Sequence, residues 1–344
     1  MSPPVPAAAM PEGQRAPAST PAPCVSIGMP VYNGERYLAC AVESILGQDF
    51  TDFELIICDN ASTDRTAEIC RAFAERDPRV RYYRNPENLG AGPNYDRCFH
   101  LARGIYFKWA AHDDCLAPDY LFKTVVAMDA STDAVLCTVG MAEIDADDQI
   151  QRVYQNHFPG IASPDPARRL AAVIHTRHEC EDFFGLFRRE ALLGSSLHGT
   201  YSGSDRVLLA EMALRGPWVS VPDPLFLHRE HDGRYTRAVL LADRSQAALW
   251  LDTKVPTARA SRHFHLGVYR QYLRVVPKVV GPFRMRVACY AELLRWWLTD
   301  GHFPDVLRDL LSESPQVRAL IRGARDRVLR ALPTSWRDAH RVRS

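Results

Sequence analysis

The sequence lacks both a long hydrophobic run and paired cysteines. No stretch of the 344 residues approaches the roughly 20 consecutive apolar residues that span a bilayer, so we expect no transmembrane helix. The nine cysteines are odd in number, include no CxxC spacing and mostly lie within apolar runs. This pattern favours buried, reduced thiols in a cytosolic protein over a disulfide framework or a zinc finger.

Two glycine-rich phosphate-binding motifs are also missing. No GxGxxG follows the first apolar run, and no GxxxxGK[ST] occurs in the chain. The closest string, Gly90-Ala91-Gly92, precedes Pro93 and has no third glycine. The usual dinucleotide-binding motif and the P-loop are therefore excluded. A phosphate group would have to be held differently, and a divalent cation on clustered carboxylates is the usual substitute.

Charge is balanced overall but uneven along the chain. The formal net charge is +1, with 47% hydrophobic and 24% charged residues, which is typical of a globular protein. Residues 241–344 carry 19 Lys and Arg against 9 Asp and Glu, a net charge of +10, which leaves −9 for residues 1–240. An acidic body with a basic C-terminal region predicts separate roles for the two parts. Residues 1–23 are rich in Pro and Ala, and we expect a disordered leader there.

Residues 24–140 alternate between short apolar runs and amphipathic segments. The apolar runs predict strands over residues 24–31, 53–58, 80–83, 105–111 and 135–139. Helices are predicted between them, one over residues 34–48 and one with Ser62 or Thr63 as its N-cap. Apolar strands that alternate with helices predict a mostly parallel sheet covered by helices on both faces. Ligands of such sheets bind beyond the carboxyl ends of the strands.

Polar residues stand at these predicted strand ends: Asn33, Asp59, Arg84, His112, Asp113 and Asp114. Their convergence on one edge favours a ligand site over solvated turns. Asp113-Asp114, directly after an apolar strand, could supply oxygen ligands for a divalent cation. Trp109 and Lys108 precede this pair and should point to opposite faces of the strand. We expect Trp109 in the core and Lys108 near a bound phosphate.

Five ordered segments resemble the glycosyltransferases of family 2, which have the GT-A fold. They are VSIGMPVYNGERYL at 25–38, SILGQ and FELIICDNASTD at 44–64, NLG at 88–90 and KWAAHDD at 108–114. Order and spacing agree from residue 24 to about 235. The resemblance implies an α/β fold, with a GT-A nucleotide-binding domain over residues 24–235. A basic, helical C-terminal extension over residues 236–344 follows it.

The resemblance also implies an activity and a set of binding residues. The expected reaction moves a sugar, with inversion, from a nucleotide-diphosphate donor to an acceptor hydroxyl in glycan, glycolipid or cell-surface polysaccharide biosynthesis. Mg²⁺ or Mn²⁺ is the expected cofactor, and Asp113, Asp114 and His231 are its expected ligands. Residues expected to contact the nucleotide sugar are Pro30, Tyr32, Glu35, Asp59, Arg84 and Asp113.

The sequence departs from the family pattern at two points. Ala111-His112 stands where the family often has the first carboxylate of Asp-x-Asp-Asp, so either remaining aspartate could hold the metal. Asn94-Tyr95-Asp96 stands where Ala-Arg-Asn is frequent. An arginine contact to the nucleotide could therefore be lost or move to Arg97 or Arg84.

Segment 203–216 resembles the family helix that carries the catalytic base. Ser204-Asp205 stands where Glu-Asp is frequent, so Asp205 is the predicted base that deprotonates the acceptor hydroxyl. A helix N-cap is the alternative role for Asp205. The nearby Glu181-Asp182 pair could contact acceptor hydroxyls or cap a turn, and the sequence does not choose between these roles.

The basic C-terminal region reads as helices. Residues 284–297 place four apolar side chains on one predicted face: Val287, Tyr290, Leu294 and Trp297. Packing against the catalytic domain and docking on an anionic membrane both remain open. In the second case we expect Trp296, Trp297 and Leu298 to enter the lipid.

The expected partners are therefore a nucleotide-sugar donor and a glycan or lipid-linked acceptor. No nucleic-acid partner is expected, because no recognised motif or aromatic platform is present. The expected location is the cytoplasm, with peripheral contact at the inner face of the plasma membrane as an option. Two alternative functions stay open, a catalytically inactive nucleotide-sugar-binding module and a nucleotidyltransferase.

Overall fold

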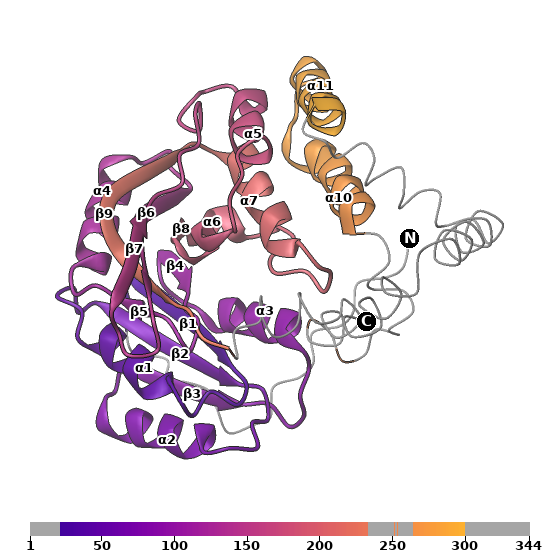
Figure 1. The fold of residues 1–344 in the computed structure, drawn as a ribbon. Helices are drawn as coiled ribbons and strands as arrows, with labels where there is room; N and C mark the ends of the chain where they lie inside the picture. The colour runs from indigo at the N-terminus through magenta and orange to yellow at the C-terminus, as the bar shows by residue number, and fades with distance from the viewer. Residues whose placement is uncertain (1–20, 233–250, 252, 254–263, 300–344) are drawn as a thin grey trace, which may run out of the picture.

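A computed structural model describes residues 21–232, 251, 253 and 264–299 of the chain. These residues form one sheet with helices on both faces (Figure 1), which confirms the predicted α/β fold. The strands follow in the order β3-β2-β1-β4-β8-β6-β9-β5, and β7 pairs with β6 at the side. The predicted leader, apart from residues 21–23, lies outside the described residues.

The first half of the sheet is parallel and buried. The strands with their bounds are β1 (Val25–Val31), β2 (Phe53–Asp59), β3 (Val80–Arg84), β4 (Tyr106–Trp109), β5 (Cys115–Leu116), β6 (Leu136–Ile144), β7 (Ile150–Tyr154), β8 (Leu186–Arg188) and β9 (Trp218–Arg229). β1 pairs in parallel with β2 and β4, and β2 pairs in parallel with β3. Every residue of β1 and β2 is buried, because helices cover both of their faces. The five predicted strands are all present, although β4 is shorter than expected and β6 is longer.

The second half of the sheet is mixed. β8 runs antiparallel to β4 and β6, and β5 runs antiparallel to β9, while β6 and β9 are parallel. β7 is an exposed antiparallel partner of β6. The sequence pattern did not predict β7 or β9, because β7 has no buried face and exposed residues interrupt the first part of β9.

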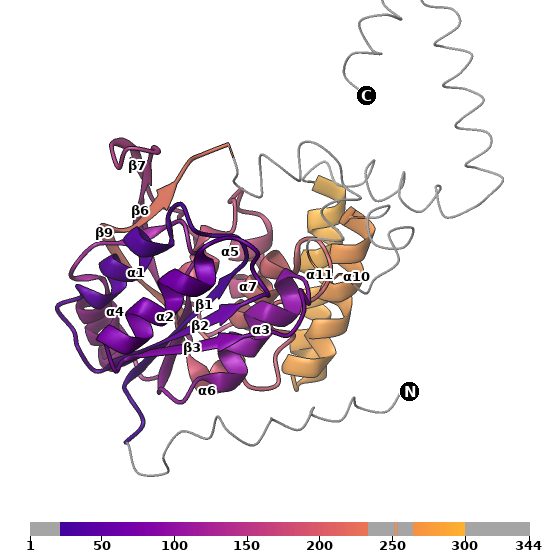
Figure 2. The same cartoon turned by 90° about the horizontal axis from the view of Figure 1, so that it is seen from below.

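The helices cover the sheet and extend beyond it (Figure 2). Their bounds are α1 (Leu38–Leu46), α2 (Thr66–Arg76), α3 (Ala91–Leu101), α4 (Tyr120–Ala130), α5 (Pro166–Ile174), the 3₁₀ helix η1 (Glu181–Phe184), α6 (Arg189–Leu192), α7 (Ser204–Arg215), α10 (Phe264–Val279) and α11 (Phe283–Thr299). No helix among the described residues is long and apolar enough to cross a membrane.

The predicted N-cap of α2 is wrong. The helix begins at Thr66, and neither Ser62 nor Thr63 caps it. Both residues instead bond to the loop after β1: the Asn33 amide donates to Ser62 Oγ at 3.0 Å, and the Thr63 amide donates to Asn33 Oδ1 at 2.8 Å. Residues 60–65 therefore serve as a bridge between two strand ends, which delays the start of the helix.

Trp109 and Lys108 point to opposite faces of the sheet, as predicted. Trp109 is fully buried and stacks on Phe183, with ring centroids 4.5 Å apart. Lys108 is also fully buried, and its Nζ donates to the Trp109 carbonyl at 3.0 Å and lies 4.7 Å from the centre of the Tyr120 ring. The expectation that Lys108 approaches a phosphate is therefore wrong, because its ammonium group is enclosed by the core.

α10 and α11 lie side by side against α7 and α5 (Figures 1 and 2). Val276 of α10 and Cys289, Leu293 and Trp296 of α11 belong to the apolar cluster that joins these helices. Of the four apolar side chains on the predicted face of α11, Val287 and Leu294 are exposed.

Glu54, near the amino end of β2, is a buried carboxylate with donors from three neighbouring segments. Ser26 Oγ donates at 2.7 Å, Arg81 Nη1 at 2.6 Å and Arg103 Nη2 at 2.9 Å. Burial by itself would raise the pKa of Glu54, but these hydrogen bonds more than offset it, so the pKa lies below its ordinary value of 4.5. Glu54 thus joins β1, β2, β3 and the α3–β4 connection.

We expect Glu54→Gln to lower the free energy of unfolding by about 2 kcal/mol at pH 7, less than for a fully buried pair because both arginines are partly solvated. The lowered pKa stabilises the fold above pH 4.5 and loses that effect as the pH falls through the folded-state value. Urea unfolding at pH 7 and at pH 3.5 should therefore show a difference from wild type that shrinks in acid. Glu68→Gln, which removes the exposed Arg65–Glu68 pair, is the control and should unfold like the wild type. Equal effects of the two substitutions would contradict this assignment.

Candidate functional site

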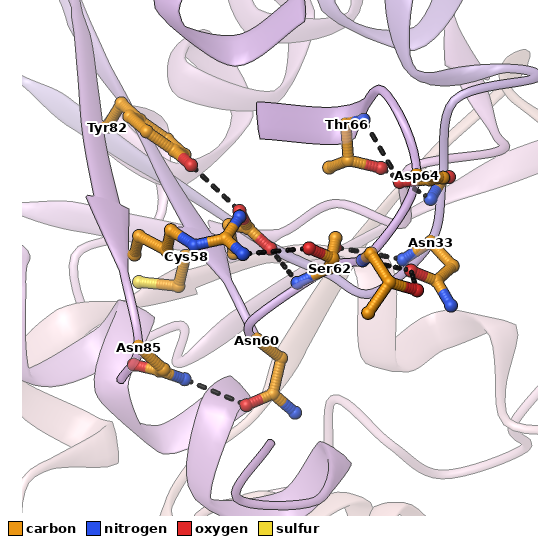
Figure 3. Close-up of polar contacts among 12 residues, drawn as sticks. Asn33, Cys58, Asn60, Ser62, Asp64, Thr66, Tyr82 and Asn85 are labelled. Atoms are coloured by element: carbon orange, nitrogen blue, oxygen red, sulfur yellow. Dashed lines mark hydrogen bonds and ion pairs between the residues drawn. The ribbon is translucent and has the colours of Figure 1, made fainter. Parts of the chain in front are cut away.

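The sheet register brings three polar strand ends into one row. Val31 pairs with Asp59, and Asp59 pairs with Arg84, so β1, β2 and β3 end at the same edge. Asp59 is fully buried, and donors reach both of its carboxylate oxygens. The Ser62 amide donates to Oδ1 at 2.8 Å, while Tyr82 Oη and Arg84 Nη1 each donate to Oδ2 at 2.7 Å. Figure 3 shows Tyr82 and Ser62 on either side of this strand end.

The loop after β1 supplies the next group of predicted contacts. Pro30 is buried within β1 opposite Cys58, whereas Tyr32 is 43% exposed. The Glu35 carboxylate accepts the Arg65 amide at 3.0 Å, so it fixes the start of α2 to this loop. A Cβ on Gly34 would meet the His112 ring at 2.5 Å, which shows how closely the loops after β1 and β4 approach.

Four asparagines form a hydrogen-bonded network behind this edge: Asn60, Asn85, Asn88 and Asn94. Asn85 is central, because its Nδ2 donates to Asn60 Oδ1 at 2.8 Å and its Oδ1 accepts Arg97 Nη1 at 2.6 Å (Figure 3 shows the first bond). Arg97 is thereby tied to the network. The partly exposed Arg84 is the arginine that lies directly at the strand end.

Asp113 and His231 meet at the carboxyl end of β4. His231 Nε2 lies 3.0 Å from Asp113 Oδ2, and both side chains are largely buried. Burial alone would raise the pKa of Asp113, but the imidazoles of His112 and His231 hold it at about 2. The His231 ring also packs on Tyr37, with centroids 4.8 Å apart. Two of the three predicted metal ligands are therefore in contact.

Arg229, at the end of β9, fixes the third predicted ligand. Its amide donates to Asp114 Oδ1 at 2.9 Å, and its Nε donates to the Asp113 carbonyl at 2.9 Å. The guanidinium is almost fully buried and pairs with Asp148 at 2.6 Å. It also lies over the Tyr37 ring at 4.8 Å. This arginine thus joins β9, the turn after β4 and the β6–β7 connection.

Two groups of side chains offer possible ligands for a metal ion. Among the described residues, three ligand atoms come within 4.8 Å of one another in one group: Cys40, Cys115 and Asp148. There the Arg229 guanidinium already provides the positive charge, since it pairs with Asp148. Asp113, Asp114 and His231 are not that compact, but the two adjacent carboxylates supply the oxygen ligands that suit Mg²⁺ or Mn²⁺.

Asp205 is the second residue of α7, and Gly203 is the N-cap, with a φ of 83°. The alternative role of Asp205 as N-cap is therefore wrong. Burial first, and then the charges of Asp113, Asp114 and Asp205, raise the pKa of Tyr95. Trp109 Nε1 donates to the Tyr95 carbonyl at 3.0 Å, and the Tyr95 ring stacks on His198 beside Ser204, so Tyr95 lies near both the end of β4 and the start of α7.

Two aromatic side chains beside Asp205 were missed by the sequence analysis. Tyr95 stacks on His198, with centroids 4.5 Å apart. His198 Nδ1 lies 3.4 Å from Ser204 Oγ, and burial lowers the pKa of this imidazole although Asp205 opposes the effect. The one feature of the sequence that could have indicated His198 is its position five residues before the segment 203–216, which carries Asp205.

Glu181 and Asp182 lie in η1 and are buried. Asn156 Nδ2 donates to Asp182 Oδ2 at 2.7 Å. Burial, with a smaller contribution from Glu181, raises the pKa of Asp182 to about 7. Asp182 therefore differs from Asp205, which is only partly buried at the start of its helix.

Known proteins share this sequence pattern. Residues 26–193 match the family described as glycosyl transferase family 2. Chondroitin synthase of Escherichia coli is 41% identical over 97 residues, which is 28% of this chain and 14% of that protein. The putative glycosyltransferase EpsE of Bacillus subtilis is 35% identical over 124 residues, 36% of this chain and 45% of that protein. The chain thus spans less than half the length of either relative.

Solved structures share the fold. The crystal structure of S. aureus TarS 1-349 in complex with UDP-GlcNAc superposes with a TM-score of 0.58 and 15% identity, covering 86% of this chain and 83% of that chain. The structure of TarS 1-349 without a named ligand gives a TM-score of 0.57. Residues 26–193 thus resemble glycosyl transferase family 2, and the fold of the chain is the GT-A fold.

Proposed function

We propose that the protein transfers a sugar, with inversion, from a nucleoside-diphosphate donor to an acceptor hydroxyl, with the help of a divalent cation. The observation that carries the proposal is the Asp113–His231 pair at the carboxyl end of β4. Asp59 is the last residue of β2, in the same sheet. Asp205 is at the start of α7, where His198 stacks on Tyr95 and lies beside Ser204. A donor-binding edge and a candidate base thus face one region.

The donor nucleotide is assigned to the ends of β1, β2 and β3. Tyr32 offers an exposed ring, and Arg84 offers a partly exposed guanidinium. Asp59 is fully buried with donors on both carboxylate oxygens, so its proposed hydrogen bond to the base would have to replace the bond from Tyr82 or Arg84. Pro30 shapes the floor of the site, and Glu35 holds the loop that carries Tyr32.

The diphosphate is assigned to the turn after β4. Asp113, Asp114 and His231 would hold Mg²⁺ or Mn²⁺. Arg229 holds the Asp114 carboxylate through its backbone amide and the Asp113 backbone carbonyl through its side chain. When bound, the cation neutralises the negative charge that develops on the departing diphosphate. The sequence has no glycine-rich phosphate loop that could bind the diphosphate in place of the cation.

Asp205 is assigned the role of general base. It takes the proton of the acceptor hydroxyl while the acceptor oxygen bonds to the anomeric carbon and the bond to the diphosphate breaks on the opposite side. This geometry inverts the anomeric configuration. Tyr95 and His198 form a stacked wall beside the carboxylate. The similarity to chondroitin synthase supports a polysaccharide or glycolipid product, and a cytoplasmic location remains a prediction.

Asp113→Asn and Asp114→Asn should each lower metal-dependent release of nucleoside diphosphate by about 100-fold or more, because a charge clamp on the leaving group is lost. The measurement is donor turnover with Mn²⁺ and with excess EDTA. Asp133→Asn, at an exposed position before β6, is the matched control and should keep full turnover. Undiminished activity in EDTA would remove the metal from the proposal.

Asp205→Asn should bind the donor normally but transfer sugar about 10²- to 10⁴-fold more slowly, because an amide cannot accept the acceptor proton. Donor affinity by calorimetry and transfer at saturating acceptor separate the two effects. Asp165→Asn, at the N-cap of α5, is the control for replacing an aspartate at a helix start. Near-normal transfer by the Asp205 variant would move the base elsewhere.

Asp182 is the alternative candidate for the general base, and its raised pKa makes the stability of the protein depend on pH. Between its ordinary pKa of 3.8 and the folded-state value of about 7, folding takes up a proton, so Asp182 lowers stability as the pH rises through this window. Asp182→Asn should therefore raise the free energy of unfolding by about 2 kcal/mol at pH 8 and leave it unchanged near pH 4. Thermal unfolding at both pH values tests this, and transfer activity should persist. Loss of transfer with intact donor binding would instead identify Asp182 as the base.

A further inference from the structure

The outward side of α11 carries a continuous apolar stripe. Four exposed side chains define this stripe: Phe283, Val287, Leu294 and Leu298. Their spacing of four, seven and four residues confines them to an arc of about 60° on a helix that turns about 100° per residue, over a length of about 22 Å. Phe283 is 78% exposed and Leu298 is 58% exposed. The opposite side of α11 packs on α5 and α10, so the helix is apolar on two sides.

Basic side chains line one edge of the stripe. Arg284 and Arg295 are exposed and stand about a quarter turn from its centre at helical spacing. Residues 264–299 contain six basic residues and one acidic residue, a net charge of +5. The acidic residue, Glu292, is already engaged by His175 at 3.2 Å and by Arg295 at 3.4 Å. The surface formed by α10 and α11 is therefore cationic as well as apolar.

We propose that α11 docks on an anionic lipid surface, with the stripe entering the interface between headgroups and acyl chains. An apolar face flanked by arginines is the arrangement of helices that lie in this interface. Two copies of this surface would bring like charges together, which opposes self-association. Anionic headgroups complement the same arginines.

The structure assigns the inserted residues differently from the sequence. Trp296 was expected to enter the lipid, but it is buried against Tyr272, with ring centroids 5.8 Å apart. Trp297 lies against Tyr269. These tryptophans anchor α11 to the helices beneath it, and of the three residues expected to insert, Leu298 remains on the exposed side.

The docking surface is connected to the proposed base through one helix. α11 packs on α10, and α10 packs on α7, the helix that carries Asp205. The docking itself does not depend on the proposed transferase activity, because lipid binding can be measured without donor or acceptor.

The test is co-sedimentation of the full chain with vesicles of phosphatidylglycerol and phosphatidylcholine, and with vesicles of phosphatidylcholine alone, at 0.1 M and 1 M NaCl. We expect binding to the anionic vesicles, weakened at 1 M salt because the screening length falls from about 10 Å to about 3 Å. Val287→Ser/Leu294→Ser/Leu298→Ser should lower binding by at least about ten-fold, through lost apolar contact. Arg284→Gln/Arg295→Gln should lower binding to the anionic vesicles by about five-fold for each arginine and leave binding to the phosphatidylcholine vesicles unchanged.

The matched control is Phe122→Ser/Val126→Ser, which removes two exposed apolar side chains from α4 and should leave binding unchanged. Circular dichroism confirms that each variant is folded. Absence of binding by the wild type overturns the proposal, and so does binding that the stripe variant retains in full. A dimer that the stripe variant dissociates, without vesicle binding, would also overturn it and assign the stripe to a second copy of the chain.

Discussion

The candidate site depends on one buried cation, Arg229. A guanidinium with 1% exposure must find acceptors inside the protein, and this one finds the Asp113 carbonyl, the Asp145 carbonyl and the Asp148 carboxylate. These acceptors belong to the turn after β4 and to the β6–β7 connection, which are far apart in sequence. Because desolvating an arginine is costly unless its donors are satisfied, the three segments are held together, and the carboxylate of Asp114 is oriented with them.

A second buried ion group fixes the amino ends of β1, β2 and β3. Glu54 lies near the amino end of β2, where donors from β1, β3 and the α3–β4 connection reach it, and Asp59 ends β2 at the carboxyl end. Between them every residue of β2 is buried. Apolar burial supplies most of the stabilisation, but it does not select a register among similar apolar strands. The carboxylates add that selection, since a shift by one residue would leave a buried charge without its donors.

Apolar burial is visible in the sequence as local patterns, whereas contacts between distant polar residues are not. This difference explains which features the sequence predicted. The strands β1 to β4 and the polar residues at their ends follow from apolar runs, which are local signals. The start of α2 could not be predicted, because Ser62 and Thr63 bond to Asn33 across the sheet edge instead of capping a helix. The contact between Tyr95 and His198 could not be predicted for a similar reason. The two rings stack only because the fold brings α3 and the loop before α7 together. In α11 both sides are apolar, so periodicity could not tell the buried Leu293 from the exposed Leu294.

The two halves of the site are consequently built in different ways. The donor side rests on strand ends whose positions are set by backbone pairing in the sheet. The acceptor side rests on α7, in which every residue from Val207 to Leu214 is buried, so its orientation is set by the helices packed around it. α5 and α10 contact α7 directly, and α11 contacts α5. Interiors are close-packed, so a displacement of α10 and α11 cannot be absorbed without moving α7. The position of Asp205 relative to the donor edge is therefore set by the packing of α5 and α10 against α7.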